Sequence, residues 1–453
     1  MIVKNDPKII NGWTFYDWAN SVYNLVITSV VFPKFFLAQT KHLEGLPQDT
    51  VLFFGREFNN VELYSYVFSA SFIIVSFLVP LLSGIADYLG NKKRFMQFFC
   101  YLGALSCISM FFFDVNHLEI SMLSPFFASI GFWGSLVFYN SYLPEIATPD
   151  QHDRISAKGF SLGYIGSIIL LITIIVALQV VKDPELSRMI PRYGFIAVGL
   201  WWAGFAQITY MRLPNNVYDK KPEKDKGYIY KGYRELRRVW SELSDQAQLK
   251  RFLLSFFIYN MGVQTIMLLA VVFADEEINW PIDEVTGEAD KTGLIVSIIL
   301  IQLVAVVGAL VMSRLSRKIG NIAVIKISVI FWFGICVVAY FITEPMQFYG
   351  LAAAVGFVMG GIQSMSRSTY SKMLPETTDH ASYFSFYDVL EKIGLIIGPF
   401  LFGFACGHLG GMRNAVIILG SIFIIGFISL YWVKSIKPDK IKGIKAISDT
   451  NLV

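Results

Sequence analysis

A carboxylate and two carboxamides lie close together in an apolar stretch near the start of the chain, in the segment Trp13-Thr-Phe-Tyr-Asp-Trp-Ala-Asn-Ser-Val-Tyr-Asn24. Asp17, Asn20 and Asn24 recur at intervals of three and four residues, which places them on one face of a helix. An ionisable side chain at membrane depth is unfavourable by several kcal/mol unless it faces a cavity or a partner. The face is therefore a candidate path for a solute or an ion, although the three groups could instead form hydrogen bonds with neighbouring helices.

The composition is that of a membrane-embedded chain. Of 453 residues, 55% are hydrophobic and only 16% are charged, which leaves too little polar surface for a soluble protein of this length. Apolar runs long enough to cross a bilayer recur throughout the chain. Twelve spans are predicted, at 11–38, 64–86, 94–113, 121–143, 158–181, 192–212, 250–274, 292–313, 321–342, 347–366, 383–406 and 412–434. Polar residues up to Asn11 precede a long span, so no signal peptide is expected.

Basic residues indicate how the spans are oriented. With twelve spans, both ends of the chain lie on one side, and the loops of that side carry most of the Lys and Arg, including Lys92, Lys93 and Arg94. We therefore predict a multi-pass protein of the cytoplasmic (inner) cell membrane with both termini in the cytoplasm. The net charge of +4 reflects this topology and gives no reason to expect a nucleic-acid partner.

Motifs for enzyme chemistry are missing from the sequence. The four cysteines fall within predicted spans without CxxC spacing, and the five histidines are scattered. There is no nucleophile elbow, phosphate-binding loop or pair of catalytic carboxylates. We predict neither an enzyme nor a metal or cofactor site.

The spans and the charged segments divide the chain into four parts. These are a six-span lobe (1–212), a linker (213–250), a second six-span lobe (251–437) and a tail (438–453). The charged run 220–226 in the linker is expected to be flexible and solvated. Leu236, Trp240 and Leu243 then recur at helical spacing, which predicts an amphipathic helix on the inner membrane surface or a simple connector between the lobes.

The two predicted lobes repeat short motifs in the same order. The matching pairs are 16–17 with 259–260 (Tyr-Asp and Tyr-Asn), 83–94 with 313–321 (Gly-Asn near basic residues), and 143–145 with 374–376 (Leu-Pro-Glu). Repeated halves of six spans are typical of two-lobe transporters, whose substrate site lies between the lobes near the middle of the membrane.

The loop 87–93 (Asp-Tyr-Leu-Gly-Asn-Lys-Lys) resembles the signature between the second and third helices of the major facilitator superfamily, with Ser83 in place of its first glycine. The resemblance implies an all-α integral membrane fold of twelve transmembrane helices in two pseudo-symmetric six-helix lobes. In the second copy Arg317 stands where the aspartate would, so only the first copy is expected to work fully.

The Tyr-Asp-Trp-Ala-Asn opening at 16–20 looks, more narrowly, like the "unknown major facilitator" branch, which includes the vacuolar amino-acid effluxers of autophagy. Further similar stretches are 143–147, 158–166, 256–265, 363–368 and 391–399. An acidic residue often follows the Tyr-Asn of the seventh helix in this branch, and here that residue is Met261. The resemblance implies movement of a solute across a membrane, with amino acids as the leading class, but it names no substrate.

Polar side chains on the first and seventh helices could bind a polar, zwitterionic or hydroxylated solute without fixed charge. We expect two sets to face each other across the pseudo-twofold axis, namely Asn20, Tyr23 and Asn24 with Tyr259, Asn260 and Gln264. Further lining candidates are Tyr139, Asn140 and Gln363. The alternative for each of these residues is a hydrogen bond between helices.

Buried charges would couple transport to a gradient. Burial favours the neutral form of a carboxylic acid, so Asp17 is the candidate to exchange a proton, unless it stays paired with Arg367 or Lys392. Glu391 and Lys392 are adjacent and point about 100° apart on a helix, so we expect them not to pair with each other. Glu145 is a further predicted partner for Lys392.

Asp87 is expected to act at a cytoplasmic gate. At the end of the second helix it can accept hydrogen bonds from the N-terminus of a facing helix of the other lobe or pair with a basic residue, although it could also be a solvated loop residue. The same predicted gate includes Gly90, Lys92 and Lys93. In the eleventh helix, Gly398 and Pro399 allow the close packing and bending that a moving helix requires.

Taken together, these features predict a monomeric secondary transporter that moves a small polar solute, with protons, across a lipid bilayer by alternating access. No nucleotide motif is present, so a gradient must drive uphill transport. One rival is a lipid flippase or scramblase on the same fold, which would have an apolar lateral opening. The other is a non-transporting receptor or scaffold, which should tolerate Asp17→Asn.

Overall fold

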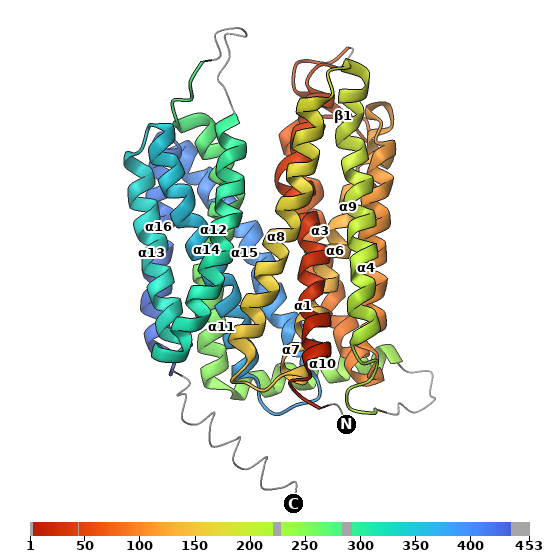
Figure 1. Cartoon of the computed structure of the whole chain (residues 1–453), viewed down its shortest axis with the longest axis vertical. Coiled ribbons are helices and arrows are strands. Elements are labelled where there is room, and N and C mark those ends of the chain that lie inside the picture. Colours follow the sequence, from red (N-terminus) through yellow and green to blue (C-terminus); the bar gives the residue numbers. More distant parts are fainter. Residues whose placement is uncertain (1–2, 44, 221–227, 283–291, 436–453) are drawn as a thin grey trace, which may run out of the picture. The chain divides into compact units, whose positions relative to one another are not determined.

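The computed structural model describes residues 3–43, 45–220, 228–282 and 292–435, and long helices make up most of it (Figure 1). Two predicted features are affected by these limits. Residues 221–226 of the charged run and the whole of the predicted tail 438–453 lie outside the described residues.

Helices occupy the six spans predicted for the first half of the chain. They are α1 (Pro7–Val22), η1 (Tyr23–Val31) and α2 (Phe32–Thr40), α3 (Asn60–Leu89), α4 (Lys92–Ser109) with η2 (Met110–Phe112), α6 (Leu123–Asn140) with α7 (Leu143–Ile146), α8 (His152–Val180) and α9 (Pro184–Arg212). Short elements join them, namely η3 (Val115–His117), α5 (Leu118–Ser121) and an antiparallel hairpin of β1 (Thr50–Phe53) and β2 (Arg56–Asn59) with Val51 opposite Phe58.

Helices also occupy the predicted spans of the second half. The predicted amphipathic helix is α10 (Tyr228–Asp245). It is followed by α11 (Ala247–Glu277), α12 (Thr292–Ile319), α13 (Asn321–Phe341), α14 (Pro345–Met373), α15 (His380–Leu409), and α16 (Met412–Ser429) with η4 (Leu430–Trp432).

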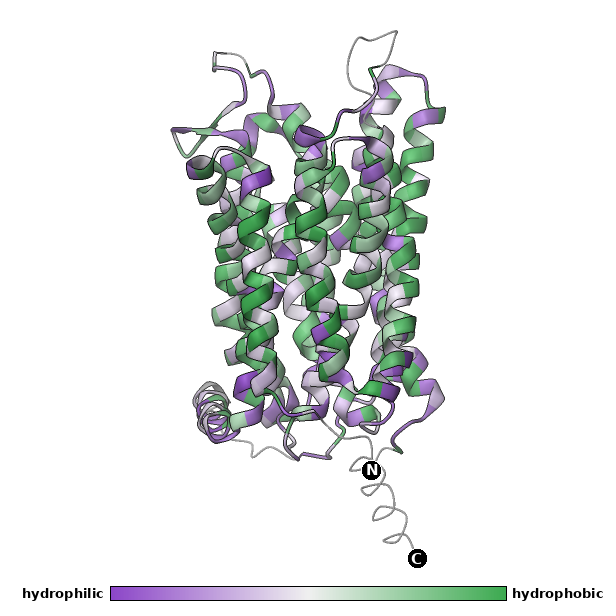
Figure 2. Ribbon diagram, turned by 90° about the vertical axis from the view of Figure 1, so that its left-hand side faces the viewer, coloured by the Kyte–Doolittle hydropathy of each residue, from purple (hydrophilic) through white to green (hydrophobic). Residues whose placement is uncertain are grey.

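Among the described residues, eleven helical segments are long and apolar enough to cross a membrane. The sixth predicted span, 192–212, corresponds to α9, whose apolar part contains two tryptophans, a glutamine and a tyrosine that lower its mean hydropathy. Along the individual helices, apolar residues occupy the middle and hydrophilic residues gather near the ends (Figure 2). The predicted all-α membrane fold is therefore confirmed.

The first span is not a regular α-helix throughout. At Tyr23 it passes into η1, a π-helix of nine residues, before α2 completes the span. Hydroxyl groups satisfy two carbonyls of η1, because Ser29 Oγ donates to Asn24 O at 2.9 Å and the Tyr64 hydroxyl donates to Thr28 O at 3.2 Å. π-Helical segments are rare and often occur at functional sites, and this one begins directly after the polar face of α1.

The described chain forms two compact units, each built from several separate stretches. Unit 1 combines described residues of 1–142, 162–238 and 378–389, and unit 2 combines those of 143–161, 239–377 and 390–453. Both α8 and α15 contribute residues to each unit. The predicted division into lobes at 213–250 stays a prediction.

The two units repeat one packing scheme. In unit 1, α9 packs against α1 and α4, and α6 packs against α3 and α4. In unit 2, α16 packs against α11 and α13, and α14 packs against α12 and α13. The pairs correspond in chain order, helix by helix, as expected if the two halves of the chain are repeats of one structure.

Glycine allows α12 and α14 to pack closely. A Cβ added at Gly360 would collide with the backbone of Ala305, and one added at Gly308 would collide with the backbone of Phe357. Small residues of this kind let membrane helices approach each other and gain van der Waals contact.

Candidate functional site

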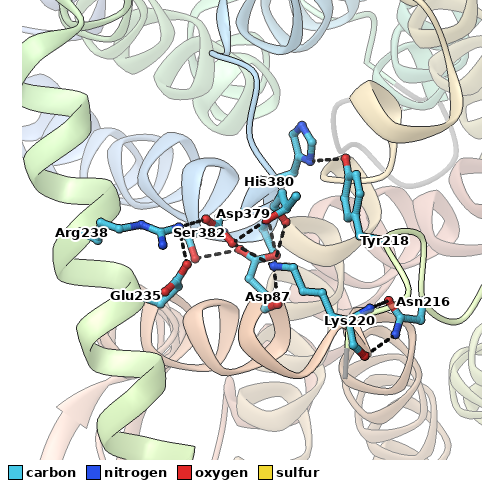
Figure 3. Close-up of polar contacts among 11 residues, drawn as sticks. Asp87, Asn216, Tyr218, Lys220, Glu235, Arg238, Asp379, His380 and Ser382 are labelled. Carbon is cyan, nitrogen blue, oxygen red and sulfur yellow. Dashed lines mark hydrogen bonds and ion pairs between the residues drawn. The ribbon is translucent and has the colours of Figure 1, made fainter. Parts of the chain in front are cut away.

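The carboxylate of Asp87, near the C-terminal end of α3, is bonded to the start of α15 (Figure 3). It accepts hydrogen bonds from the backbone N–H groups of Ser382 at 2.7 Å and Ala381 at 3.3 Å, and from the Ser382 hydroxyl at 2.8 Å. The first N–H groups of a helix have no partner within the helix and carry partial positive charge, so a carboxylate stabilises them. The hydrogen bonds predicted for Asp87 are present, and its 3% exposed side chain is shielded from water.

The loop after α3 fastens neighbouring helix ends. Gly90 ends α3 in the left-handed conformation, with φ of 65°. Lys92 is buried with its ammonium 4.4 Å from the centre of the Tyr142 ring, and Lys93 Nζ donates to Leu213 O, at the end of α9, at 2.8 Å. The two lysines of the predicted gate therefore contact other parts of unit 1, Lys92 the Tyr142 ring and Lys93 the Leu213 carbonyl.

Linker residues that the sequence analysis did not single out reach the same place. Asp379, one residue before α15, forms ion pairs with Lys220 at 3.0 Å and with Arg238 (Figure 3). Lys220 Nζ also donates to Asp87 O at 2.8 Å. The prediction of a flexible, solvated run is wrong for Lys220, because its charge is held by buried acceptors. An acidic residue next to a helix start was a visible signal, but its cationic partners lie more than a hundred residues earlier in the chain.

Asp17 is buried in α1 and has an aromatic partner. The Tyr139 hydroxyl donates to Asp17 Oδ2 at 2.8 Å, and Trp13 Nε1 donates to Tyr139 O at 2.8 Å. The rings of Trp13 and Tyr139 stack with centroids 4.5 Å apart. Tyr139, predicted to line a solute path, is thus joined to the predicted proton site.

Other predicted residues of unit 1 keep polar atoms uncommitted. Asn20 is 1% exposed, and in the described part of the chain neither its Nδ2 nor the hydroxyl of buried Tyr23 has a hydrogen-bond partner. A buried polar atom left this way is unfavourable by about 1–3 kcal/mol. Asn24 and Asn140 are half-buried. Asn20 and Tyr23 therefore stay the stronger candidates for contact with a solute.

In unit 2, predicted residues of α11 bond to α14 and α15. The Tyr259 hydroxyl lies 2.7 Å from Ser366 Oγ, and Gln264 Nε2 donates to Glu391 Oε1 at 2.7 Å. Tyr259 and Gln264 therefore form hydrogen bonds between helices, which was the alternative to contact with a solute.

Asn260, also on α11, differs from these two residues. It is 6% exposed, and its Nδ2 finds no hydrogen-bond partner among the residues described. Gln363 Nε2 makes a 3.4 Å contact with Met267 Sδ. Each unit thus holds a buried carboxamide on one of two corresponding helices, Asn20 on α1 and Asn260 on α11. The predicted meeting of the two sets across an axis stays a prediction.

The prediction that Glu391 and Lys392 do not pair is wrong. Lys392 Nζ lies 3.7 Å from Glu391 Oε2, because long side chains can bend toward each other even when their Cβ atoms point apart. The Lys392 side chain is fully buried. Its predicted pairing with Glu145, which is itself 2% exposed in α7, stays a prediction, as does its pairing with Asp17.

Arg367 in α14 is held within unit 2. Its Nε donates to Ser156 Oγ and its Nη2 donates to Ser156 O, both at 3.0 Å. The guanidinium also lies 4.1 Å from the centre of the Phe160 ring. These contacts join α14 to the start of α8.

A second buried carboxylate meets the loop between α12 and α13. Asp153, in the first turn of α8, accepts hydrogen bonds from Lys372 Nζ at 2.6 Å, Asn321 Nδ2 at 2.7 Å and Ser316 Oγ at 2.8 Å. This revises the expectation drawn from Arg317, because the second loop also has a carboxylate partner. In the first copy the loop's own helix supplies the acid, whereas in the second copy the facing helix start supplies it.

Gly398 and Pro399, the two predicted gating residues of the eleventh span, lie inside α15. Gly398 lies so close to Thr265 that an added Cβ would collide with it, and Pro399 follows directly.

Over the described ranges, no three His, Cys, Asp or Glu side chains form a group that could hold a metal ion. A cavity within unit 2, lined by residues such as Ile266, Phe273 and Phe402, has only apolar walls and no group to orient a polar solute.

Helices of membrane-spanning length, packed in the same pairs in both halves, are the architecture of the major facilitator class of transporters. The E. coli fucose:proton symporter FucP matches with a TM-score of 0.66 at 15% identity, covering 95% of this chain and 98% of that one. The proton:xylose symporter XylE matches with a TM-score of 0.69 at 11% identity, covering 94% and 96%. At such identities the likeness shows the fold alone.

The family described as "Vacuole effluxer Atg22 like" matches residues 5–440, and this chain belongs to it. The "Uncharacterized MFS-type transporter YxiO" of Bacillus subtilis (strain 168) is 28% identical over 436 residues, covering 95% of this chain and 96% of that protein. "Autophagy-related protein 22-1" of Penicillium rubens is 23% identical, covering 83% and 76%. The predicted kinship with major facilitators and their autophagy-linked branch is confirmed, and the chain is a multi-pass membrane protein of this transporter family.

Proposed function

We propose that this protein is a secondary transporter of a small polar solute, with amino acids as the leading class, and that transport is coupled to protons. The observation that carries the proposal is the buried carboxylate of Asp17 in a membrane-spanning helix, bonded to Tyr139 and one turn away from Asn20. As a carboxylate Asp17 accepts a hydrogen from Tyr139, whereas as a carboxylic acid it would also be a donor. Uptake of a proton would therefore rearrange this contact.

The carboxamides are suited to the two ends of a zwitterion. Asn20 and Asn260 each offer an N–H₂ donor for a carboxylate and a carbonyl acceptor for an ammonium group, without a fixed charge that would favour one end. Both side chains are buried and both have an Nδ2 with no hydrogen-bond partner in the described ranges. A solute could supply those missing partners, and the free energy of doing so would contribute to its binding.

Asp87 supplies the gate in this proposal. Alternating access requires contacts that form in one state and break in the other. The bonds from Asp87 to Ala381 and Ser382 join two spans that are far apart in the sequence, so they can break without unfolding either helix. We further propose that both termini are cytoplasmic, that the protein works as a monomer in the cell membrane, and that it is not an enzyme. The distribution of Lys and Arg supports the orientation.

Transport by the purified full chain in liposomes tests the proposal. A pH-sensitive dye is enclosed, a proton gradient is imposed, and a panel of amino acids, dipeptides and sugars is added. We expect a solute-dependent proton movement from at least one amino acid, and we expect Asp17→Asn to abolish it. Asp183→Asn is the matched control, because Asp183 is an exposed carboxylate that caps α9 by accepting from Leu186 N–H at 2.9 Å.

The outcomes separate the rivals. Flux of radiolabelled solute without proton movement would overturn the coupling and leave the transport. Movement of a fluorescent phospholipid between leaflets, without solute flux, would favour the flippase. Full activity of Asp17→Asn would remove Asp17 from the mechanism.

A further inference from the structure

We infer that the linker is a clamp on the gate, in which Lys220 and Arg238 hold Asp379 and so position the start of α15 against Asp87. This rests on the gating role proposed for Asp87. The clamp consists of Lys220, Glu235, Arg238 and Asp379, and all four residues belong to unit 1 (Figure 3). None of them belongs to the loop signature that defines the predicted gate.

The first part of the linker is fixed before it reaches Lys220. The Tyr142 hydroxyl donates to Pro214 O at 2.9 Å. Asn216 then closes a turn on Lys220, accepting from its backbone N–H at 3.1 Å and donating to its carbonyl at 2.8 Å. The backbone at Lys220 is therefore set in position, and only its side chain has to be ordered when it binds.

The Lys220 ammonium joins α3 to the approach of α15. It donates to Asp87 O at 2.8 Å, to Asp379 Oδ1 at 3.0 Å and to Thr378 O at 3.4 Å. These acceptors use the three donors of an ammonium group. The Asp379 side chain is 1% exposed, so this ion pair is screened far less than a surface pair.

Helix α10 supplies the second cation and is itself seated on α3. Arg238 contacts the carboxylates of Glu235 and Asp379. A Cβ added at Gly232 would collide with Ile85, which shows how closely α10 approaches α3 three residues before Glu235. The position of Arg238 is thus set by helix packing as well as by its ion pairs.

A stacked pair strengthens the connection on the other side of Asp379. The Tyr218 hydroxyl lies 3.3 Å from His380 Nδ1, and the two rings stack with centroids 6.1 Å apart. The linker therefore contacts Thr378, Asp379 and His380 in succession, directly before the two residues whose N–H groups Asp87 accepts.

This succession explains why the linker positions the gate. Removing Lys220 or Arg238 would leave the buried charge of Asp379 with fewer partners, and a buried charge that loses its partner is strongly unfavourable. The start of α15 can leave Asp87 only if Asp379 leaves both cations or draws the linker with it. A segment that connects the two halves of the chain would thereby make opening of the gate depend on its own position.

Pulsed electron–electron double resonance between two spin labels on the full chain tests the clamp. Labels are attached at Tyr233→Cys on the exposed side of α10 and at Thr378→Cys, in a Cys406→Ser background, because the other three native cysteines are buried. We expect one narrow distance in this background. Asp379→Asn and Lys220→Met should each raise the population of a second, longer distance by about tenfold or more, as expected from the loss of a charge-assisted bond. Lys220→Arg should restore the narrow distance. Glu376→Gln, an exposed carboxylate three residues from Asp379, is the matched control.

The double variant Lys220→Met/Asp379→Asn shows whether the two residues act through one contact. We expect its released population to be no larger than that of the stronger single variant. Unchanged distances in both single variants, or multiplied effects in the double variant, would overturn the clamp. The measurement needs no substrate, so it can fail while the transport assay succeeds, and the transport assay can fail while the clamp stands.

Discussion

The carboxylate of Asp87 should stabilise the contact between α3 and the first turn of α15. Asp87→Asn should raise the population in which this contact is broken, by a factor that follows from the hydrogen bonds. Hydrogen bonds to a charged group stabilise by about 1.5–3 kcal/mol each, and neutral ones by about 0.5–1.5 kcal/mol. The asparagine keeps a neutral acceptor for the bonds that Ser382 makes at 2.7 and 2.8 Å, and the 3.3 Å bond from Ala381 is weak from the start. The net loss is then about 2–3 kcal/mol, or about a 30- to 150-fold rise in the open population. No discount for solvent is needed, because Asp87 is 3% exposed.

Hydrogen exchange measures this opening directly. The N–H groups of Ala381 and Ser382 are the donors themselves, so their exchange rates should rise by the same factor. Asp183→Asn is the control, because Asn caps a helix about as well as Asp, and the exchange of Leu186 N–H should change by no more than about twofold. The reasoning would be refuted by exchange at Ala381 and Ser382 that stays within twofold of wild type. Equal acceleration along the whole of α15 would also refute it, since that would report general destabilisation.

Three other predictions concern separate parts of the structure. Burial and then the neighbouring Asp379 carboxylate raise the pKa of Glu235 to about 7, against the charges of Arg238 and Lys220 that also face it. The stabilisation from neutral Glu235 is complete below its usual pKa of 4.5 and is lost as the pH rises through about 7. The distribution of distances between α10 and α15 should therefore broaden from about pH 5 to pH 8 in wild type, and it should not broaden in Glu235→Gln. Asp153→Asn or Lys372→Met should each lower the free energy of unfolding by about 3–5 kcal/mol, because each leaves a buried partner charge unpaired. In detergent, the double variant should lower the thermal midpoint by less than the sum of the decreases caused by the two single variants. Gly360→Ala should lower the thermal midpoint by forcing α14 off α12, whereas Gly350→Ala on the same helix, where an added Cβ meets open space, should not; equal midpoints would contradict the close packing.

Much of the candidate site could be predicted from local features of the sequence. Asp17 stands out because a carboxylate within an apolar run needs a partner wherever the neighbouring helices lie. The same reasoning applied to Asp87, which lies three residues before Gly90 at the end of a span, where a carboxylate again needs a partner. The spans themselves follow from hydropathy, because every backbone group in a bilayer must be satisfied within its own helix. These features depend on residues that are neighbours in the sequence.

The partners of these residues could not be predicted in this way. Tyr139 reaches Asp17 across 122 positions and Lys220 reaches Asp379 across 159. The sequence shows that such groups need partners, but many side chains could supply them. The error over Glu391 and Lys392 has a related origin, since Cβ directions were used where side-chain length decided the contact.

The sequence by itself determined that this protein is a helical membrane protein with repeated halves and with isolated polar groups that must be satisfied. Tertiary structure alone decided that Asp379 is held by the linker and that Asp153, from α8, completes the second loop. The physical reason is that burial in a bilayer and helix formation are set by each stretch of chain separately. The choice of one charged partner among several requires the geometry of helices brought together from distant parts of the chain.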